Sequence, residues 1–203
     1  NTGEQLAYII NHSKARFIFA ENKVQYDKLA ECRSELPNLE KVILFENVET
    51  ADVDWTISFS DFLKLGESKD NKPLQERLKS IDKDDNAFII YTSGTTGVPK
   101  AVLTTHYHLS YVGETLLRRF EMPFKSRSIS YLPLSHIAEQ IATNNLQLET
   151  GGEVHMCPNA LHMKDYLPLV QPNVLLGVPR VWEKVESALK GIIEGSTGFK
   201  KKL

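Results

Sequence analysis

A run of ten residues near the middle of the chain is dense in hydroxyl groups and glycines. It reads Tyr91-Thr92-Ser93-Gly94-Thr95-Thr96-Gly97-Val98-Pro99-Lys100. Glycines let the backbone approach a ligand closely, so that successive N–H groups can point at phosphate oxygens. The Ser and Thr hydroxyls add donors and can contact a magnesium ion, and Lys100 brings the only formal positive charge of the run. This inventory predicts a loop, residues 91–100, that binds a polyphosphate.

Two other interpretations of the loop fit less well. Ser, Thr and Gly favour turns for purely conformational reasons, but four hydroxyl side chains between apolar strands are unusual for a simple turn. A Walker A loop needs Gly, four residues, Gly, Lys and then Ser or Thr at the start of a helix. Here Gly94 and Gly97 are too close, Val98-Pro99 intervenes and Ala101 follows Lys100. The spacing and the strand expected after the loop both argue against a Walker site.

Short apolar segments on both sides must position this loop. Ala87–Tyr91 carries no charge, as expected of a strand buried on both faces in a largely parallel sheet. Lys100–Thr104 is expected to form the next strand, and apolar residues then recur at helical spacing from Leu109 to Phe120. Further on, we expect strands at Ser128–Leu132, Val154–Met156 and Val174–Val178, and helices at Ile137–Leu148, Tyr166–Val170 and Val181–Ile193.

The residues before the loop alternate in the same way. Apolar periodicity at Leu6–Ile10 and a helix at Val24–Cys32 go with strands at Phe17–Phe19 and Val42–Phe45. Residues 47–83 are polar, and we expect them to be irregular apart from a short helix at 74–78. We therefore predict two α/β parts, residues 1–83 and 84–203, in a layered fold of largely parallel sheets flanked by helices.

Composition limits the classes of function. The 203 residues include 24 basic and 26 acidic side chains, and the formal charge of -2 argues against nucleic acid as a partner. Cys32 and Cys157 stand apart, without the spacing of a disulfide framework or a zinc site. No apolar run reaches a membrane-spanning length, and the first residues do not resemble a signal peptide. We expect an intracellular protein, cytoplasmic or peripheral to a membrane, and a fragment, since the chain does not begin with Met.

The loop resembles the phosphate-binding signature of the adenylate-forming superfamily, which includes acyl-CoA synthetases, luciferases and nonribosomal peptide adenylation domains. The resemblance implies that the loop contacts the β- and γ-phosphates of ATP, and that Lys100 and Thr96 act in catalysis. It also makes the Thr96 hydroxyl the expected magnesium contact. The implied ATP-binding residues are Thr92, Ser93, Gly94, Thr95, Thr96, Gly97 and Lys100.

Ser130-Tyr131-Leu132-Pro133-Leu134-Ser135-His136-Ile137-Ala138-Glu139 resembles the next motif of the superfamily. In that motif a strand ends in a Pro-containing turn, and a His begins a helix beside the acyl pocket. The similarity implies that His136 is catalytic and lies near the carboxylate and the adenylate. Ser135 is the expected N-cap. The alternative is that His136 only satisfies local hydrogen bonds at the start of a helix.

Gly177-Val178-Pro179-Arg180-Val181-Trp182-Glu183-Lys184 is similar to a segment of the long-chain fatty acid synthetases, including the bubblegum-like and bacterial branches. The similarity implies that Gly177, Val178 and Pro179 line the substrate pocket together with His136, whereas Trp182 is better explained by packing. Gln5–Ser13 and Leu36–Lys41 also resemble long-chain synthetase segments. Gln140 departs from the pattern, because long-chain relatives often carry Arg there.

The resemblance implies an AMP-forming long-chain fatty acid–CoA ligase, of which this chain is part of the large amino-terminal domain, with the carboxy-terminal domain absent. Such an enzyme uses ATP, Mg²⁺ and coenzyme A to convert a long-chain fatty acid into an acyl-adenylate and then an acyl-CoA, releasing AMP and pyrophosphate. Peripheral membrane contact is compatible with an apolar substrate. The chain alone is expected to be inactive. Two alternatives stay open: adenylation of an aryl or amino acid, and a noncatalytic nucleotide-binding module.

Overall fold

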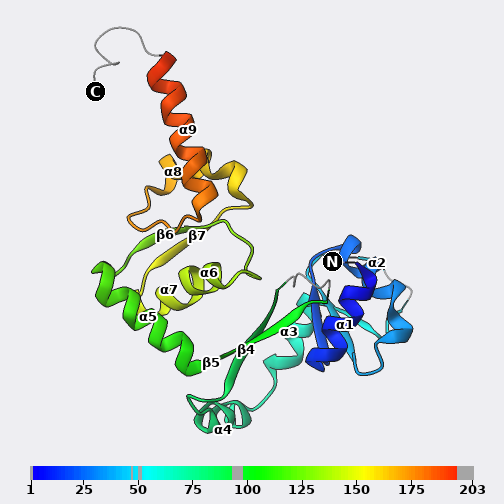
Figure 1. The fold of residues 1–203 in the computed structure, drawn as a ribbon. Coiled ribbons are helices and arrows are strands. Elements are labelled where there is room, and N and C mark those ends of the chain that lie inside the picture. Colours follow the sequence, from blue (N-terminus) through cyan, green and yellow to red (C-terminus); the bar gives the residue numbers. More distant parts are fainter. Residues whose placement is uncertain (1, 47, 50–51, 93–97, 196–203) are drawn as a thin grey trace. The chain divides into compact units, whose positions relative to one another are not determined.

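The chain folds into two compact units, Asn1–Thr105 and His106–Leu203, in which helices and strands alternate (Figure 1). This computed structural model describes residues 2–46, 48–49, 52–92 and 98–195. The boundary between the units falls between Thr105 and His106, so the strands on both sides of the loop belong to the first unit. The domain division at residues 83 and 84 stays a prediction.

The first unit contains a parallel sheet of β1 (Phe17–Ala20), β2 (Lys41–Leu44) and β3 (Thr56–Ser58), in the order β1-β2-β3. The central strand β2 is the most deeply buried, with Val42 and Ile43 both 0% exposed. A continuous apolar run is what a strand covered on both faces requires. The α/β class with largely parallel sheets is confirmed.

Helix α1 (Gly3–Ser13) precedes β1, and α2 (Lys23–Glu31) connects β1 to the segment before β2. The start of α1 is fixed by a capping box, in which the Thr2 hydroxyl accepts from the Gln5 backbone and the Gln5 side chain accepts from the Thr2 backbone. The helix ends at Lys14, whose left-handed φ of 55° turns the chain toward β1. These local signals set the boundaries that the apolar periodicity alone left open.

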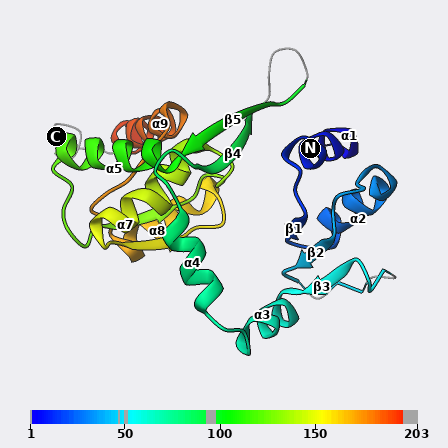
Figure 2. The same ribbon diagram turned by 90° about the horizontal axis from the view of Figure 1, so that it is seen from below.

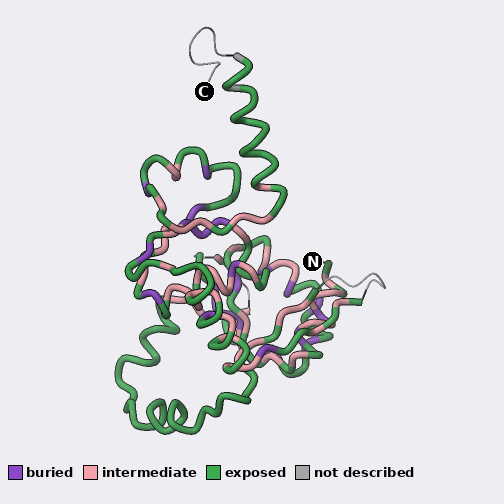
Figure 3. The backbone as a smooth tube through the Cα atoms, turned by 60° about the vertical axis from the view of Figure 1, so that its left-hand side comes forward, coloured by how far each residue is buried: buried purple, intermediate pink, exposed green. Residues whose placement is uncertain are grey.

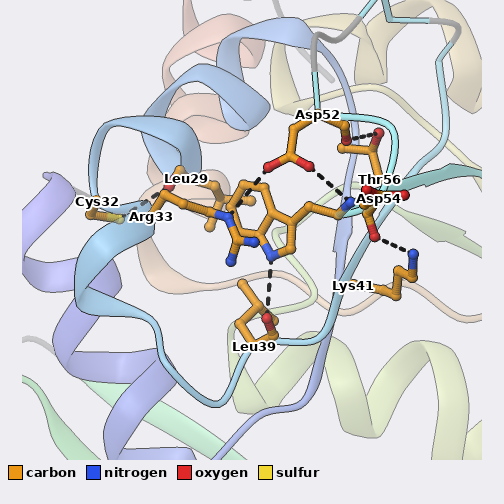
Figure 4. A network of polar contacts seen from close by, with 9 residues as sticks. Leu29, Cys32, Arg33, Leu39, Lys41, Asp52, Asp54 and Thr56 are labelled. Carbon is orange, nitrogen blue, oxygen red and sulfur yellow. Dashed lines mark hydrogen bonds and ion pairs between the residues drawn. The ribbon is translucent and has the colours of Figure 1, made fainter.

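Trp55 closes the core of this unit just before β3, within the network of Leu39, Asp52 and Arg33 that Figure 4 labels. It is 2% exposed, and its indole Nε1 donates to the Leu39 carbonyl at 3.2 Å. Its backbone N–H donates to the Asp52 carboxylate at 3.1 Å, and the Arg33 guanidinium lies 4.1 Å from the ring centroid. The ring therefore ties the 3₁₀ turn Arg33–Glu35 to the segments that enter β2 and β3.

The segment expected to be irregular, 47–83, is in fact largely regular in its described part. It contains β3, α3 (Phe59–Glu67) and α4 (Lys72–Ser80), and α3 and α4 follow one another between β3 and β4 (Figure 2). The Ser58 hydroxyl caps α3 by accepting from the Asp61 backbone. The short helix expected at 74–78 lies within α4. The polar composition suggested irregular structure, but a helix that is exposed along its whole length, as α4 is, also consists mostly of polar residues.

β4 (Asn86–Thr92) and β5 (Lys100–Thr105) form an antiparallel pair, with Tyr91 opposite Ala101 and Thr92 opposite Lys100. The prediction that the first of these strands is buried in a parallel sheet is wrong for the described residues, since Ile89 is 38% exposed. The two strands pair antiparallel because the connection between them is short, whereas parallel pairing needs a crossover of about a dozen residues or more.

The second unit begins with α5 (His106–Phe120), followed by a parallel pair of β6 (Arg127–Ser130) and β7 (Glu153–Met156). A continuous helical run lies between these strands and consists of α6 (Ile137–Glu139), a π-helical turn (Gln140–Asn145) and α7 (Leu146–Thr150). The 3₁₀ turn Ala160–His162, α8 (Met163–Val170) and α9 (Pro179–Gly195) complete the unit. Most of α9 is exposed (Figure 3). None of the described helices is long and apolar enough to cross a membrane.

The strand expected at Val174–Val178 is not formed, since residues 171–178, all of them described, contain no regular strand. The Arg127 carbonyl accepts from the N–H groups of Asn173 (3.0 Å) and Val174 (3.2 Å). Further on, the Tyr131 hydroxyl donates to the Leu176 carbonyl at 2.8 Å. Side-chain and single backbone contacts thus hold this segment beside β6 in place of a ladder.

Candidate functional site

The β4–β5 pair holds the two ends of the predicted phosphate loop in register. Thr92 and Lys100 are opposite each other, and the Thr92 hydroxyl donates to the Lys100 carbonyl at 3.4 Å. Opposed residues of an antiparallel pair project from the same face, and the preceding residue of each strand projects from the other. The exposed side chains of Thr92 and Lys100 therefore share one face, as binding of one anionic ligand would require.

The central part of the loop lies outside the described residues. This applies to Ser93, Gly94, Thr95, Thr96 and Gly97, which were expected to contact phosphate, and to the magnesium contact of Thr96. Their roles stay predictions. Thr92 and Lys100 lie opposite each other at the base of the loop.

The residue just before Thr92 makes a contact that no sequence pattern indicated. The Tyr91 hydroxyl lies 2.8 Å from Nδ1 of His12, and their rings meet edge to face with centroids 5.8 Å apart. Tyr8 stacks on the His12 ring at 5.3 Å. Burial raises the pKa of the Tyr91 phenol, Tyr8 adds to this, and a hydrogen bond with Ser13 opposes it. His12 and Tyr91 are 79 residues apart in the sequence, so no local signal could have paired them.

His136 is exposed and stands at the start of α6. Its Nδ1 accepts from the Ala138 backbone N–H at 3.2 Å, which makes His136 itself the N-cap. The prediction of Ser135 as the N-cap is therefore wrong, because the imidazole takes the capping role. In the neutral ring, a Nδ1 that accepts leaves the proton on Nε2, so His136 can offer a donor to a substrate oxygen. The local hydrogen bond and a role at the substrate are thus compatible.

A buried carboxyl group follows His136 on the same helical run. Glu139 is 1% exposed, and its Oε1 accepts from the Thr143 hydroxyl at 2.8 Å. Tyr131 is 5% exposed, and burial raises the pKa of its phenol, with a smaller contribution from the charge of Glu139. The π-helical turn that begins at Gln140 is a type of helix distortion frequent at functional sites.

The segment at the start of α9 has a packing constraint of its own. The Trp182 indole donates to the Gly177 carbonyl at 2.8 Å, and a Cβ added to Gly177 would lie 2.6 Å from that ring. The glycine therefore leaves room for the Trp182 ring, whether or not it also contacts substrate. Val178 and Pro179 follow it directly, and Pro179 is the first residue of α9. Their place in a substrate pocket stays a prediction.

The second unit contains an apolar pocket of about 330 Å³, between the end of α5, β6 and the helical run after His136. Its lining includes Leu116, Ile129, Ala142, Leu146, Leu175 and Leu176. Ile129 directly precedes the motif that contains His136, and Leu176 directly precedes Gly177. The lining thus reaches the residue before each of the two motifs expected at the substrate, but His136, Gly177 and the other residues of these motifs do not line the pocket.

The described residues include no group of three or more His, Cys, Asp or Glu side chains that could hold a metal ion. The magnesium contact expected at Thr96 lies outside these residues. Mg²⁺ is bound with substrate phosphates more often than in a dedicated protein cage.

The family described as "AMP-binding enzyme" matches residues 1–201, and the chain belongs to this family. It is 30% identical to the long-chain-fatty-acid–CoA ligase ACSBG2 of Xenopus laevis and 32% identical to that of Homo sapiens. Both matches cover 100% of the chain but only 28% and 31% of the relatives. The chain thus spans less than a third of the length of these curated relatives.

Solved structures support the same fold. A putative long-chain-fatty-acid CoA ligase from Rhodopseudomonas palustris CGA009 is similar with a TM-score of 0.74 at 15% identity, over 92% of this chain and 44% of that one. The long-chain-fatty-acid-CoA ligase FadD1 from Archaeoglobus fulgidus gives a TM-score of 0.70 at 22% identity, over 97% of this chain and 36% of that one. At these identities the likeness concerns the fold alone.

Proposed function

We propose that this chain acts within an enzyme of the length of its relatives, here called the whole enzyme, that activates a long-chain fatty acid with ATP and transfers it to coenzyme A. In the first step a carboxylate oxygen attacks the α-phosphorus of ATP, and pyrophosphate leaves with formation of an acyl-adenylate. The thiolate sulfur of coenzyme A then attacks the acyl carbon, and AMP leaves. Neither step needs a nucleophile from the protein.

The observation that carries this proposal is the register of β4 and β5, which puts Thr92 and Lys100 on one face at the base of the loop. A lysine is a mobile point charge on a flexible stem, well suited to phosphate oxygens whose charge changes during the reaction. Preorganised donors of this kind lower the barrier by stabilising charge that develops in the transition state. We assign phosphate binding to Thr92 and Lys100, and to the loop residues between them by resemblance.

Magnesium belongs to the proposal as a partner of the ATP phosphates. The chemistry of the donors fits, since the loop offers hydroxyl oxygens, with Thr96 as the expected contact and the phosphates as the remaining ligands. A bound Mg²⁺ would neutralise phosphate charge. Lys100 would add a second positive charge, and Thr92 a hydroxyl, from the protein side.

The long-chain preference rests on the relatives, which are named long-chain-fatty-acid–CoA ligases. The apolar pocket of about 330 Å³, lined by the residues directly before the His136 and Gly177 motifs, supports it, because an alkyl chain gains about 0.8 kcal/mol per buried methylene. With its Nε2–H available, we assign His136 to the carboxylate end of the substrate. We further propose an intracellular location, cytoplasmic or peripheral to a membrane.

The test is an analysis of the nucleotide products formed by the whole enzyme with ATP, Mg²⁺, coenzyme A and acids of graded chain length. AMP and pyrophosphate that appear only with longer fatty acids support the proposal. AMP formed with an aryl or amino acid would keep the adenylation chemistry but overturn the assignment of a fatty acid substrate. If no acid-dependent product forms, the remaining alternative is a noncatalytic nucleotide-binding module. Lys100→Ala should lower the rate, whereas Lys23→Ala, which removes a lysine paired with Asp27 on α2, should not.

A further inference from the structure

His12 and Tyr91 connect the first helix of the chain to the strand that enters the phosphate loop. Nδ1 of His12 and the Tyr91 hydroxyl are 2.8 Å apart, the distance of a hydrogen bond. We propose that His12 is a positioning residue, which acts through Tyr91 to hold the β4 end of the loop where Thr92 can meet the phosphates of ATP. This inference rests on the proposed function.

The helix that carries His12 is a firm support. Ala7 and Ile10 of α1 are each 4% exposed and belong to the core that also contains Trp55. The Asn11 side chain donates to the Glu35 carbonyl at 2.8 Å, which fastens the last turn of α1 to the 3₁₀ turn. A group bonded to His12 is thereby held relative to the core of the first unit.

Tyr91 is held by more than one neighbour. Tyr8 stacks on the His12 ring with centroids 5.3 Å apart, which fixes the plane of the imidazole that meets Tyr91 edge to face. Ser13 also interacts with the phenol, and the burial that raises the pKa of Tyr91 agrees with a docked ring. Tyr8 thus acts on Tyr91 through the His12 ring, and Ser13 acts on the phenol itself.

The influence on the loop must pass through the backbone. Tyr91 and Ala101 project from one face of the strand pair, and Thr92 and Lys100 from the other. Tyr91 therefore does not share the face that we assign to phosphate. Fixing its side chain instead limits the twist and translation of β4 one residue before Thr92. This is a positioning effect on ATP binding, and no direct part in the reaction is assigned to His12.

The experiment is steady-state kinetics of the whole enzyme with His12→Ala, Tyr91→Phe and the double variant. We expect each single change to raise KM for ATP about threefold to tenfold, as expected for the loss of one hydrogen bond. The value of kcat at saturating ATP and KM for the fatty acid should change by less than about twofold. The double variant should be no worse than either single variant, because both remove the same bond.

Two further variants separate positioning from general stability. His12→Asn keeps a polar atom close to the position of Nδ1 and should restore KM for ATP. Gly152→Ala would place a Cβ 2.5 Å from the Ser126 carbonyl oxygen in the second unit, so it should lower the melting temperature but leave KM for ATP unchanged. An unchanged KM for ATP in His12→Ala and Tyr91→Phe, or fully additive effects on KM in the double variant, would overturn this inference but not the proposed function. A wild-type enzyme that forms no AMP would instead overturn the proposed function, and this inference with it.

Discussion

Gly177→Ala is predicted to weaken the start of α9 through one identifiable collision. The new Cβ would lie 2.6 Å from the Trp182 ring, well inside any ordinary contact distance. Overpacking of this kind costs about 1–3 kcal/mol when the neighbour cannot move. Trp182 is 47% exposed, so its ring can swing outward, at the cost of its hydrogen bond to the Gly177 carbonyl. That bond is worth about 0.5–1.5 kcal/mol, and we expect a total loss of about 1–2 kcal/mol.

The assay is denaturant unfolding of wild type, Gly177→Ala, Trp182→Ala and the double variant. If the collision with the indole is the cause, Gly177→Ala should cost little in the Trp182→Ala background. Gly191→Ala is the matched control. A Cβ on Gly191 meets nothing within 4 Å, and alanine in the interior of α9 should stabilise by about 0.5–1 kcal/mol. An equal cost of Gly177→Ala with and without Trp182 would refute this reasoning.

Three other predictions follow from the described contacts. Trp55→Phe should lower the free energy of unfolding by about 1–2 kcal/mol in a urea titration, because the Leu39 carbonyl loses its indole donor and the smaller ring leaves a gap. Gly152→Ala should lower the melting temperature, since its Cβ would lie 2.5 Å from a backbone carbonyl oxygen that cannot swing away. Arg16 holds the pKa of the Glu40 carboxyl below its usual value, so this pair should stabilise the fold above the usual Glu pKa, with the effect lost as pH falls through the lowered pKa. An NMR titration should show the pKa of Glu40 rising toward its usual value in Arg16→Gln, whereas an unchanged pKa would contradict the assignment.

The parts of the fold that the sequence predicts well are those with a local cause. Apolar spacing within a single segment predicts a strand at Phe17–Phe19 and helices at Val24–Cys32 and Leu109–Phe120, which fall on β1, α2 and α5. The hydroxyl-rich loop could also be recognised without any tertiary information. The antiparallel pairing of Thr92 with Lys100 was not predicted, although the connection between the two strands is too short for a parallel crossover.

The errors concern features that depend on contacts between distant segments. Val174–Val178 has the composition of a strand, yet its described neighbours supply only isolated hydrogen bonds. The exposure of Ile89 depends on which element covers β4, and the strand's own residues cannot specify this. The contact of His12 with Tyr91, 79 residues apart, also joins distant segments. One error is local: His136 takes the place of Ser135 as the N-cap because an imidazole can accept from the backbone, which a general ranking of capping residues does not anticipate.

The central claim is that this chain takes part in acid-dependent adenylation, and exchange of labelled pyrophosphate into ATP tests it most directly. The whole enzyme should catalyse exchange with a long-chain fatty acid and Mg²⁺ before any coenzyme A is added. Exchange should be strongly reduced in Lys100→Ala and retained in Lys23→Ala. Absence of fatty-acid-dependent exchange in the wild type, or equal exchange in both lysine variants, would contradict the account.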